Sequence, residues 1–208
     1  MKTIISVIMF LLMTTLSYSN DIYVTQSGNA LDLDITQDGD NNTIGNSTTA
    51  SASTGATTIL DIDQVGDSNV IKYQINGATY TGSIDLTGNS NDVDLNCDSG
   101  NNNSSCGTVT ANITWTGSSQ DIDLDIGETA SAAGSTVNIT GASGSDSNTI
   151  AATVDGTSAI LTLTVNGDTN NYLIDIDGNG DSIGHTLIHA HTGGIADVDI
   201  VQSGTNDN

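Results

Sequence analysis

The stretch that decides the fold runs Leu60-Asp-Ile62-Asp-Gln64-Val-Gly66-Asp-Ser-Asn69-Val-Ile71-Lys-Tyr73. Side chains alternate between the two faces of a β-strand, so Gln64 shares a face with the aliphatic residues before the glycine, and Asn69 with those after it. A buried carboxamide is costly unless it is hydrogen-bonded. Copies stacked about 4.8 Å apart can bond to one another, because each amide donates to one neighbour and accepts from the other. The stretch therefore predicts strands that turn at a glycine and stack in register.

Copies of this unit recur along the chain. The fullest one runs Leu31-Asp-Leu33-Asp-Ile35-Thr-Gln37-Asp-Gly39-Asp-Asn-Asn42-Thr-Ile44, and several glycines follow one another at steps of eleven. Two steps make a strand-turn-strand-turn coil of about 22 residues, which predicts an all-β solenoid or cross-β stack of about eight coils. The register is lost near 46–58, 96–108 and 129–147, where we expect irregular loops. The amides expected in ladders are Gln26, Gln37, Asn42, Gln64, Asn69, Asn91, Gln120, Asn170 and Gln202. The glycines expected at turns are Gly28, Gly39, Gly66, Gly77, Gly88, Gly167, Gly178 and Gly204.

The motif Gln-x-Gly-x-x-Asn, set among alternating apolar residues, resembles the repeats of curlins, the secreted subunits of bacterial curli fibres. It is complete twice, from Gln37 to Asn42 and from Gln64 to Asn69. The Asn-x-Ala step of that family is missing, because Thr43-Ile44 and Val70-Ile71 follow the two asparagines. The resemblance implies a curlin-like cross-β stack that adds subunits end to end into fibres for adhesion or biofilm matrix. It also implies partners for secretion or nucleation.

The first nineteen residues have the pattern of a secretory signal peptide. Met1-Lys2 precedes an apolar run from Ile4 to Leu16, and Ser17-Tyr-Ser19 supplies small residues for cleavage. The apolar run is shorter than the roughly 20 residues needed to span a membrane. We expect residues 1–19 to be removed, and residues 20–208 to form a single β-repeat domain in the extracellular space or at the cell surface.

Negative charge dominates the chain. Once Lys2 is removed, Lys72 is the only basic side chain beside 25 Asp and Glu, a net charge of 1 − 25 = −24. Binding to nucleic-acid phosphates requires Lys and Arg, so this class is excluded, and anionic membrane surfaces are disfavoured. Carboxylates stacked about 5 Å apart repel one another, and their hard oxygens suit Ca²⁺; the alternative is screening by monovalent salt. The acidic face expected to bind Ca²⁺ comprises Asp61, Asp63, Asp121, Asp123, Asp125, Asp175 and Asp177.

Three smaller features of the sequence are candidate sites. Cys97 and Cys106 are the two cysteines, and a close pair in an exported protein predicts a disulfide. The segment 175–181 imitates the start of an EF-hand loop, but Thr186 replaces the bidentate glutamate, so a solenoid turn is expected. The histidines are either surface residues or ligands for zinc or copper, and the sequence leaves both open. These histidines are His185, His189 and His191.

No catalytic motif stands out. The chain has no Gly-x-Ser-x-Gly elbow, no phosphate-binding Gly-x-x-x-x-Gly-Lys loop and no His-Glu-x-x-His, so we do not expect an enzyme. Three function classes remain: a fibre subunit or matrix adhesin, a monomeric binding solenoid, and a phage or cell-surface appendage component. An ice-binding solenoid would present threonines in every coil, and only Thr114-Trp-Thr116 and Thr162-Leu-Thr164 do so clearly. The fibre subunit is the expected function, because partial coils near both ends predict ends without caps.

Overall fold

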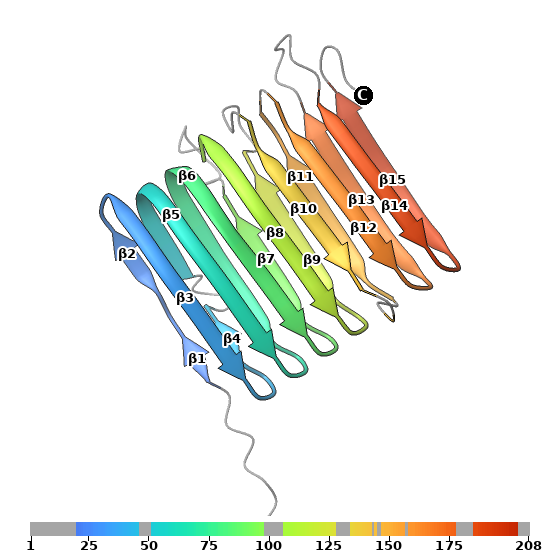
Figure 1. Cartoon of the computed structure of the whole chain (residues 1–208), viewed down its shortest axis with the longest axis horizontal. Helices are drawn as coiled ribbons and strands as arrows, with labels where there is room; N and C mark the ends of the chain where they lie inside the picture. The colour runs from blue at the N-terminus through green and yellow to red at the C-terminus, as the bar shows by residue number, and fades with distance from the viewer. Residues whose placement is uncertain are drawn as a thin grey trace, which may run out of the picture.

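The computed structural model describes residues 20–45, 51–97, 106–127, 134–142, 144, 147–156, 158–177 and 185–203. This part of the chain is a β-solenoid without helix, in which coils follow one another in chain order from blue to red (Figure 1). Its strands are β1 (Asp21–Ile22), β2 (Thr25–Ser27), β3 (Ala30–Asp38), β4 (Thr43–Ile44), β5 (Ser51–Val65), β6 (Val70–Thr87), β7 (Asp92–Asn96), β8 (Thr108–Thr116), β9 (Asp121–Ile126), β10 (Thr136–Gly141), β11 (Thr149–Val154), β12 (Ile160–Asn166), β13 (Asn170–Asp177), β14 (Thr186–Thr192) and β15 (Ala196–Ser203). The expected all-β solenoid is confirmed. No helix in these described ranges is long and apolar enough to cross a membrane.

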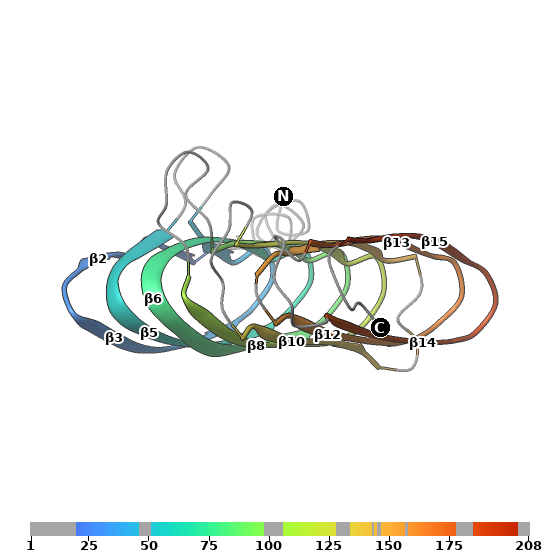
Figure 2. The same cartoon turned by 90° about the horizontal axis from the view of Figure 1, so that it is seen from above.

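Two parallel sheets face each other across the core (Figure 2). The front sheet contains β3, the second halves of β5 and β6, and then β8, β10, β12 and β14. The back sheet contains β1, β2, β4, the first halves of β5 and β6, and then β7, β9, β11, β13 and β15. The long strands β5 and β6 pass from the back sheet to the front sheet at Gly55 and Gly77, which lie side by side.

Each strand pairs in parallel with the equivalent strand of the next coil. Equivalent residues of successive coils therefore form columns along the stack. The coil length is less regular than expected. Successive coils lie roughly 26 residues apart, with individual steps of 27, 22, 29, 28 and 22 residues. The expectation of about 22 residues and eight coils is therefore corrected to longer and fewer coils. Extra residues at the ends of strands lengthen a coil without disturbing the register of the strands that follow.

Two expected loops contain strands instead. β5 begins at Ser51, inside 46–58, and β10 (Thr136–Gly141) lies inside 129–147. Both segments carry Thr, Ser, Ala or Asn on the outer face where other strands carry Asp, so they lack the sequence pattern of the repeat. Burial of Val137 and Ile139, together with ladder bonds on both sides, holds β10 in place. The third expected loop, 96–108, separates β7 from β8, and residues 98–105 lie outside the described part.

Two glycines in the core leave room for neighbouring aromatic side chains. Trp115 is buried in the column that continues to Gly141, and a Cβ added to Gly141 would lie 2.5 Å from the Trp115 ring. A Cβ on Gly82 would likewise lie 2.7 Å from the hydroxyl oxygen of Tyr80. Each glycine thus leaves the space that an aromatic ring fills, as close packing of an interior requires.

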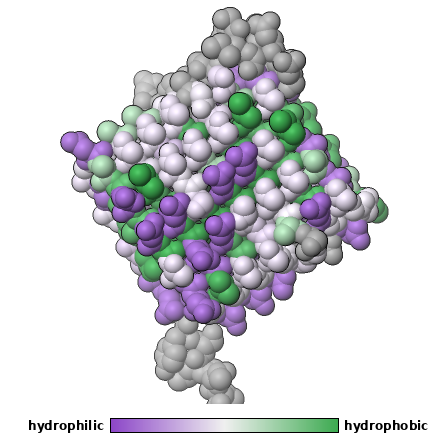
Figure 3. All heavy atoms as spheres, viewed as in Figure 1, coloured by the Kyte–Doolittle hydropathy of each residue, from purple (hydrophilic) through white to green (hydrophobic). Residues whose placement is uncertain are grey.

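The outer face of the front sheet changes character along the stack. Strongly hydrophilic side chains gather over its N-terminal strands, and residues of intermediate hydropathy cover much of the rest (Figure 3). The aligned aspartates Asp34 and Asp61 belong to the first part. Threonines such as Thr114 and Thr140, aligned in β8 and β10, belong to the second.

Candidate functional site: amide columns and open ends

One column of buried amides follows the turn of every coil from β4 to β13. The column comprises Asn42, Asn69, Asn91, Gln120, Asn148 and Asn170, each at most 3% exposed. The backbone N–H of Asn42 donates to Oδ1 of Asn69 (2.9 Å), and the N–H of Asn69 donates to Oδ1 of Asn91 (2.9 Å). The same bond joins Gln120 to Asn148 (2.9 Å) and Asn148 to Asn170 (3.1 Å). The amide oxygens of Asn69, Asn91, Asn148 and Asn170 therefore accept a backbone N–H of the preceding coil.

In three of these residues, Asn42, Asn69 and Asn91, the side-chain N–H closes the residue's own turn. Nδ2 of Asn69 donates to the carbonyl oxygen of Gly66 (2.7 Å), and Nδ2 of Asn91 donates to that of Gly88 (3.2 Å). Asn42 bonds to Gly39 in the same way. We expected amides to bond mainly to amides; here most of them bond to the main chain, and only Asn148 donates its side-chain N–H to the Asn170 amide (2.9 Å). The column thus fixes both the turn and the spacing of the coils.

The backbone before each amide has a repeated shape. The glycine three residues earlier has a φ of 132° at Gly66 and at Gly88, and the residue directly before the amide lies in the left-handed region. That residue is Ser68 (φ 62°) before Asn69 and Ser90 (φ 60°) before Asn91. A Cβ on Gly88 would lie 2.2 Å from the carbonyl oxygen of Gly66, so stacked turns require glycine for space as well as for φ.

A second column holds the inward glutamines of the front sheet, and it is short. Nε2 of Gln64 donates to Oε1 of Gln37 (2.7 Å), and Nε2 of Gln37 donates to the carbonyl oxygen of Asn20 (2.7 Å). In the following coils the column continues with Leu86 and Trp115. The glutamine pair therefore lies at one end of the stack, and the column continues from it with apolar residues.

The remaining expected ladder and turn residues lie elsewhere. Gln26 and Gln202 are in the back sheet, far apart at opposite ends of the stack, where Gln26 bonds to the carbonyl of Ala30 and Gln202 to that of His185. Gly28 and Gly77 lie at the opposite corner from the turn glycines, whereas Gly39, Gly66, Gly88 and Gly167 lie in the turns between front and back sheet strands. Gly178 and Gly204 lie outside the described residues.

The amide of Asn148 belongs to the asparagine column but was not predicted from the sequence. Its signal was the run Gly144-Ser-Asp-Ser-Asn148, which has one extra residue between the glycine and the asparagine.

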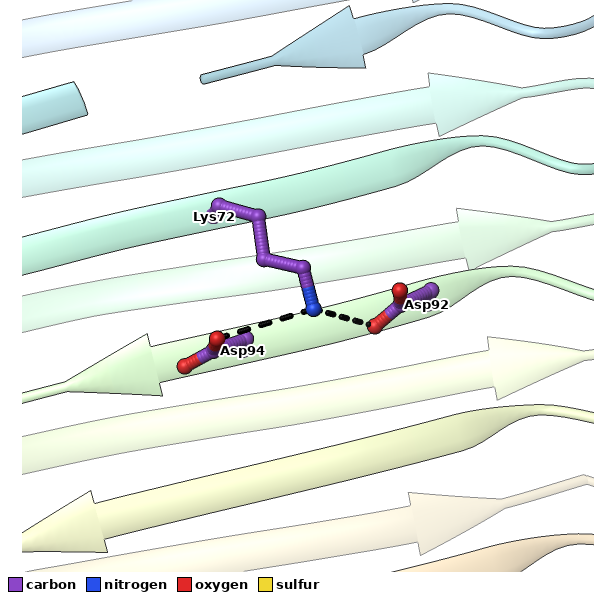
Figure 4. A network of polar contacts seen from close by, with 3 residues as sticks. All are labelled: Lys72, Asp92 and Asp94. Carbon is purple, nitrogen blue, oxygen red and sulfur yellow. Dashed lines mark hydrogen bonds and ion pairs between the residues drawn. The ribbon is translucent and has the colours of Figure 1, made fainter. Parts of the chain in front are cut away.

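The outward aspartates are partly neutralised by neighbours in the next coil. Oδ1 of Asp61 accepts the N–H (2.9 Å) and the hydroxyl (2.8 Å) of Ser83. Lys72 reaches from β6 to β7 and bridges two carboxylates, with Nζ 2.9 Å from Oδ1 of Asp92 and 3.5 Å from Oδ2 of Asp94 (Figure 4). Burial lowers the pKa of Lys72, but the hydrogen bond and charge of Asp92, and then the charge of Asp94, outweigh it and raise the pKa.

The expected acidic face is divided between the two sheets, because Asp61 and Asp63 lie on the front sheet and the other aspartates expected to bind Ca²⁺ lie on the back sheet. On the back sheet aspartates of successive coils are stacked on one another. Asp121 and Asp123 of β9 align with Asp92 and Asp94 of β7. Burial, and then the charges of Asp94 and Asp121, raise the pKa of Asp123, against a lowering by Lys72. Asp125 follows on the same strand, and Asp175 and Asp177 lie on β13. In the described ranges no three His, Cys, Asp or Glu side chains come together to hold a metal ion, so calcium binding stays a prediction.

The three histidines lie in the C-terminal coil at two different places. His185 is buried, and its Nδ1 accepts the backbone N–H of Ala159 (3.1 Å). His189 and His191 point inward from β14 onto Tyr172, with ring centroids 4.9 and 5.9 Å from that of the tyrosine. Nδ1 of His191 lies 2.9 Å from the Tyr172 hydroxyl. Burial, and then the charge of His191, lower the pKa of His189.

Cys97 and Cys106 lie at disulfide distance, with their Cα atoms 5.8 Å apart, as predicted. Both are buried, and they join the end of β7 to the segment before β8. The disulfide therefore links the two ends of the connection between β7 and β8.

In the part of the chain that the structure describes, both ends of the stack are open. At the N-terminal end the edge is formed by β1, β2 and β3, and at the C-terminal end by β14 and β15. The inward residues Val198 and Ile200 are 39% and 40% exposed, although Tyr172 and Ile174 in the same columns are buried. Among the described residues, no segment covers either edge.

Comparisons of the chain with family models, with curated proteins and with solved structures found no match.

Proposed function

We propose that the protein is a secreted structural subunit that associates end to end into an extracellular, curli-like fibre serving adhesion or biofilm matrix. The observation that carries this proposal is the pair of open ends. An uncovered parallel edge presents unpaired N–H and C=O groups along every strand, and proteins that stay monomeric usually cover such edges or interrupt them. Repeat proteins of this kind need polar capping repeats to remain soluble as single units.

The exposed apolar residues of the last coil support the same function. Val198, Ile200 and Ile195 (74% exposed) lie on β15 or directly before it, at the open end of the core. Burial of such residues against another coil is favourable by about 25 cal/mol for each Å² of apolar surface removed from water. The resemblance of the Gln37 and Gln64 segments to curlin repeats supports the biological setting. The proposal involves no catalysis.

The test is direct imaging of the purified protein without residues 1–19. We expect unbranched filaments by negative-stain electron microscopy, and a fibre diffraction reflection near 4.8 Å along the filament axis. Ile200→Lys should abolish the filaments, because it places a charge on the open end of the core. Leu173→Lys is the matched control, since Leu173 is 54% exposed but lies on the outer face of β13. Monomers that persist at high concentration would overturn the proposal.

A second candidate function is the monomeric binding solenoid, and one observation favours it. The outer face of the front sheet aligns threonines and asparagines of β8, β10 and β12 in flat columns, including Thr114, Thr140 and Thr164. The Nδ2 of Asn138 donates to Oδ1 of Asn112 (2.9 Å), which orders the row between them. An ice-binding surface of this kind predicts thermal hysteresis that Thr140→Tyr reduces and that Thr149→Tyr, on the back sheet, leaves unchanged. Electron microscopy of native material would separate a fibre from a phage or cell-surface appendage.

A further inference from the structure

We infer that consecutive copies join head to tail in a single register, with β15 of one copy beside β1 and β2 of the next, β14 beside β3, and Gln202 opposite Gln26. The inference rests on the proposed fibre and deepens it, because it names the partner as a second copy of this chain and specifies the residues that meet. Four independent features of the two ends support this register.

The first feature is a glutamine at each end of one column. Starting from Gln26, the aligned residues are Ser53, Ile75, Cys97, Ile126, Val154, Ile176 and finally Gln202. Between its ends the column is mostly apolar and buried, so an amide occurs only at the two open ends. Continuing the stack by one coil places these two amides against each other. The Gln64 and Gln37 pair, at 2.7 Å, has this arrangement inside the chain.

The second feature is the column of asparagines. It begins one coil before Asn42 at Asn20 and ends one coil after Asn170 at Ala196, so the last coil has no amide at this place. Inside the chain the N–H at this place donates to the amide oxygen of the following coil, as from Asn42 to Asn69. In the proposed register the coil that follows Ala196 is the first coil of the next copy. Its Asn20 supplies the amide that the last coil needs.

The third feature is the match of apolar residues. Val198 and Ile200 lie in the columns that begin at Ile22 and Val24, and both members of each pair are only partly buried at their own ends. In the front sheet Leu187 belongs to the column that begins at Leu33. Joining the ends therefore continues the core without a change of side-chain direction.

The fourth feature is the distribution of charge. The N-terminal edge carries Asp32, Asp34 and Asp38 on the outer face of β3. In the proposed register they meet Thr186, Ile188 and Thr192 of β14, which carry no charge. Among the described residues, the one pair of like charges is Asp21 with Asp197. Joining two N-terminal ends would instead place aspartates of β3 near one another, which is destabilising.

Cysteine crosslinking tests the register. Thr25→Cys with Val201→Cys places one thiol at each end in the same column, on the exposed outer face. Adjacent strands bring such Cα atoms to about 4.8 Å, within the range that a disulfide spans. The control, Ser27→Cys with Val201→Cys, is shifted by two residues, which separates the Cα atoms by about 8 Å and prevents the bond. Filaments of each variant are treated with diamide as the thiol oxidant and separated by non-reducing electrophoresis.

We expect a ladder of covalent dimers, trimers and longer species from the first pair, at least tenfold above the control pair. Asp21→Cys with Asp197→Cys is a second in-register pair, in case the first disturbs folding, and should give the same ladder. Filaments that crosslink equally in the shifted control would overturn the register and leave the fibre intact. The same holds if crosslinks form only between the same engineered cysteine of two copies. Absence of both filaments and covalent oligomers would overturn the fibre as well.

Discussion

Replacement of Asn69 by alanine is the sharpest test of the asparagine column. Asn69 is fully buried, and its side chain makes two bonds that no other group can replace. Its Oδ1 accepts the buried backbone N–H of Asn42, and its Nδ2 donates to the carbonyl of Gly66. The bond from its own backbone N–H to Asn91 is retained in the variant, so the perturbation is confined to one step of the stack.

The expected cost follows from the two groups left without a partner. An orphaned buried N–H or C=O costs about 1–3 kcal/mol. The Asn42 N–H is buried, whereas Gly66 is half-buried and its carbonyl can be hydrated in part. We therefore expect the free energy of unfolding to fall by about 2–4 kcal/mol in total. For a domain of this size the melting temperature should fall by about 4–16 °C.

Thermal and denaturant unfolding followed by circular dichroism would measure this loss. The matched control is Asn89→Ala, because Oδ1 of Asn89 also accepts a backbone N–H, that of Ser118 (2.6 Å), but on the exposed side of the turn. Water can replace that bond, so the control should lose no more than about 1 kcal/mol. If the two variants differ by less than about 0.5 kcal/mol, the buried amides do not hold the coils together and the reasoning fails.

Four further predictions concern other parts of the stack. Gly88→Ala should lower stability by about 2 kcal/mol or more, because its Cβ would strike the Gly66 carbonyl at a positive φ; a denaturation midpoint like that of the wild type would contradict this. The pKa of Asp123 is raised in the folded state, so its carboxylate opposes folding at neutral pH. Asp123→Asn should therefore raise the melting temperature at pH 7, and the gain should vanish below the ordinary Asp pKa, where both states are protonated. The pKa of His189 is lowered, so stability should fall as pH drops through the ordinary His value of about 6.5; an unchanged pH profile in His189→Gln would refute this. Millimolar Ca²⁺ should raise the melting temperature and speed filament growth more than NaCl of equal ionic strength, and equal effects would leave only screening.

The local chemistry of each turn could be predicted from the sequence. Leu60 to Tyr73 specifies two strands and a glycine turn by alternation alone, since side-chain direction in a strand depends only on parity. The inward placement of Gln64 and Asn69, both buried, follows from the same parity. The pairing of Cys97 with Cys106 followed from their closeness in a chain that begins with a signal-peptide pattern. These inferences needed only residues within one coil.

Only the tertiary structure determines which residues lie in the same column along the stack. A residue's neighbour along the stack depends on the number of residues in the whole coil between them, and that number varies from 22 to 29. For this reason the sequence alone does not show that Leu86 lies next to Gln64 in the column. It is also why Asn148 belongs to the asparagine column, and why Gln26 and Gln202 occupy the two ends of one column. Alternation specifies which way a side chain points, but only the folded coil lengths determine which side chain lies above it.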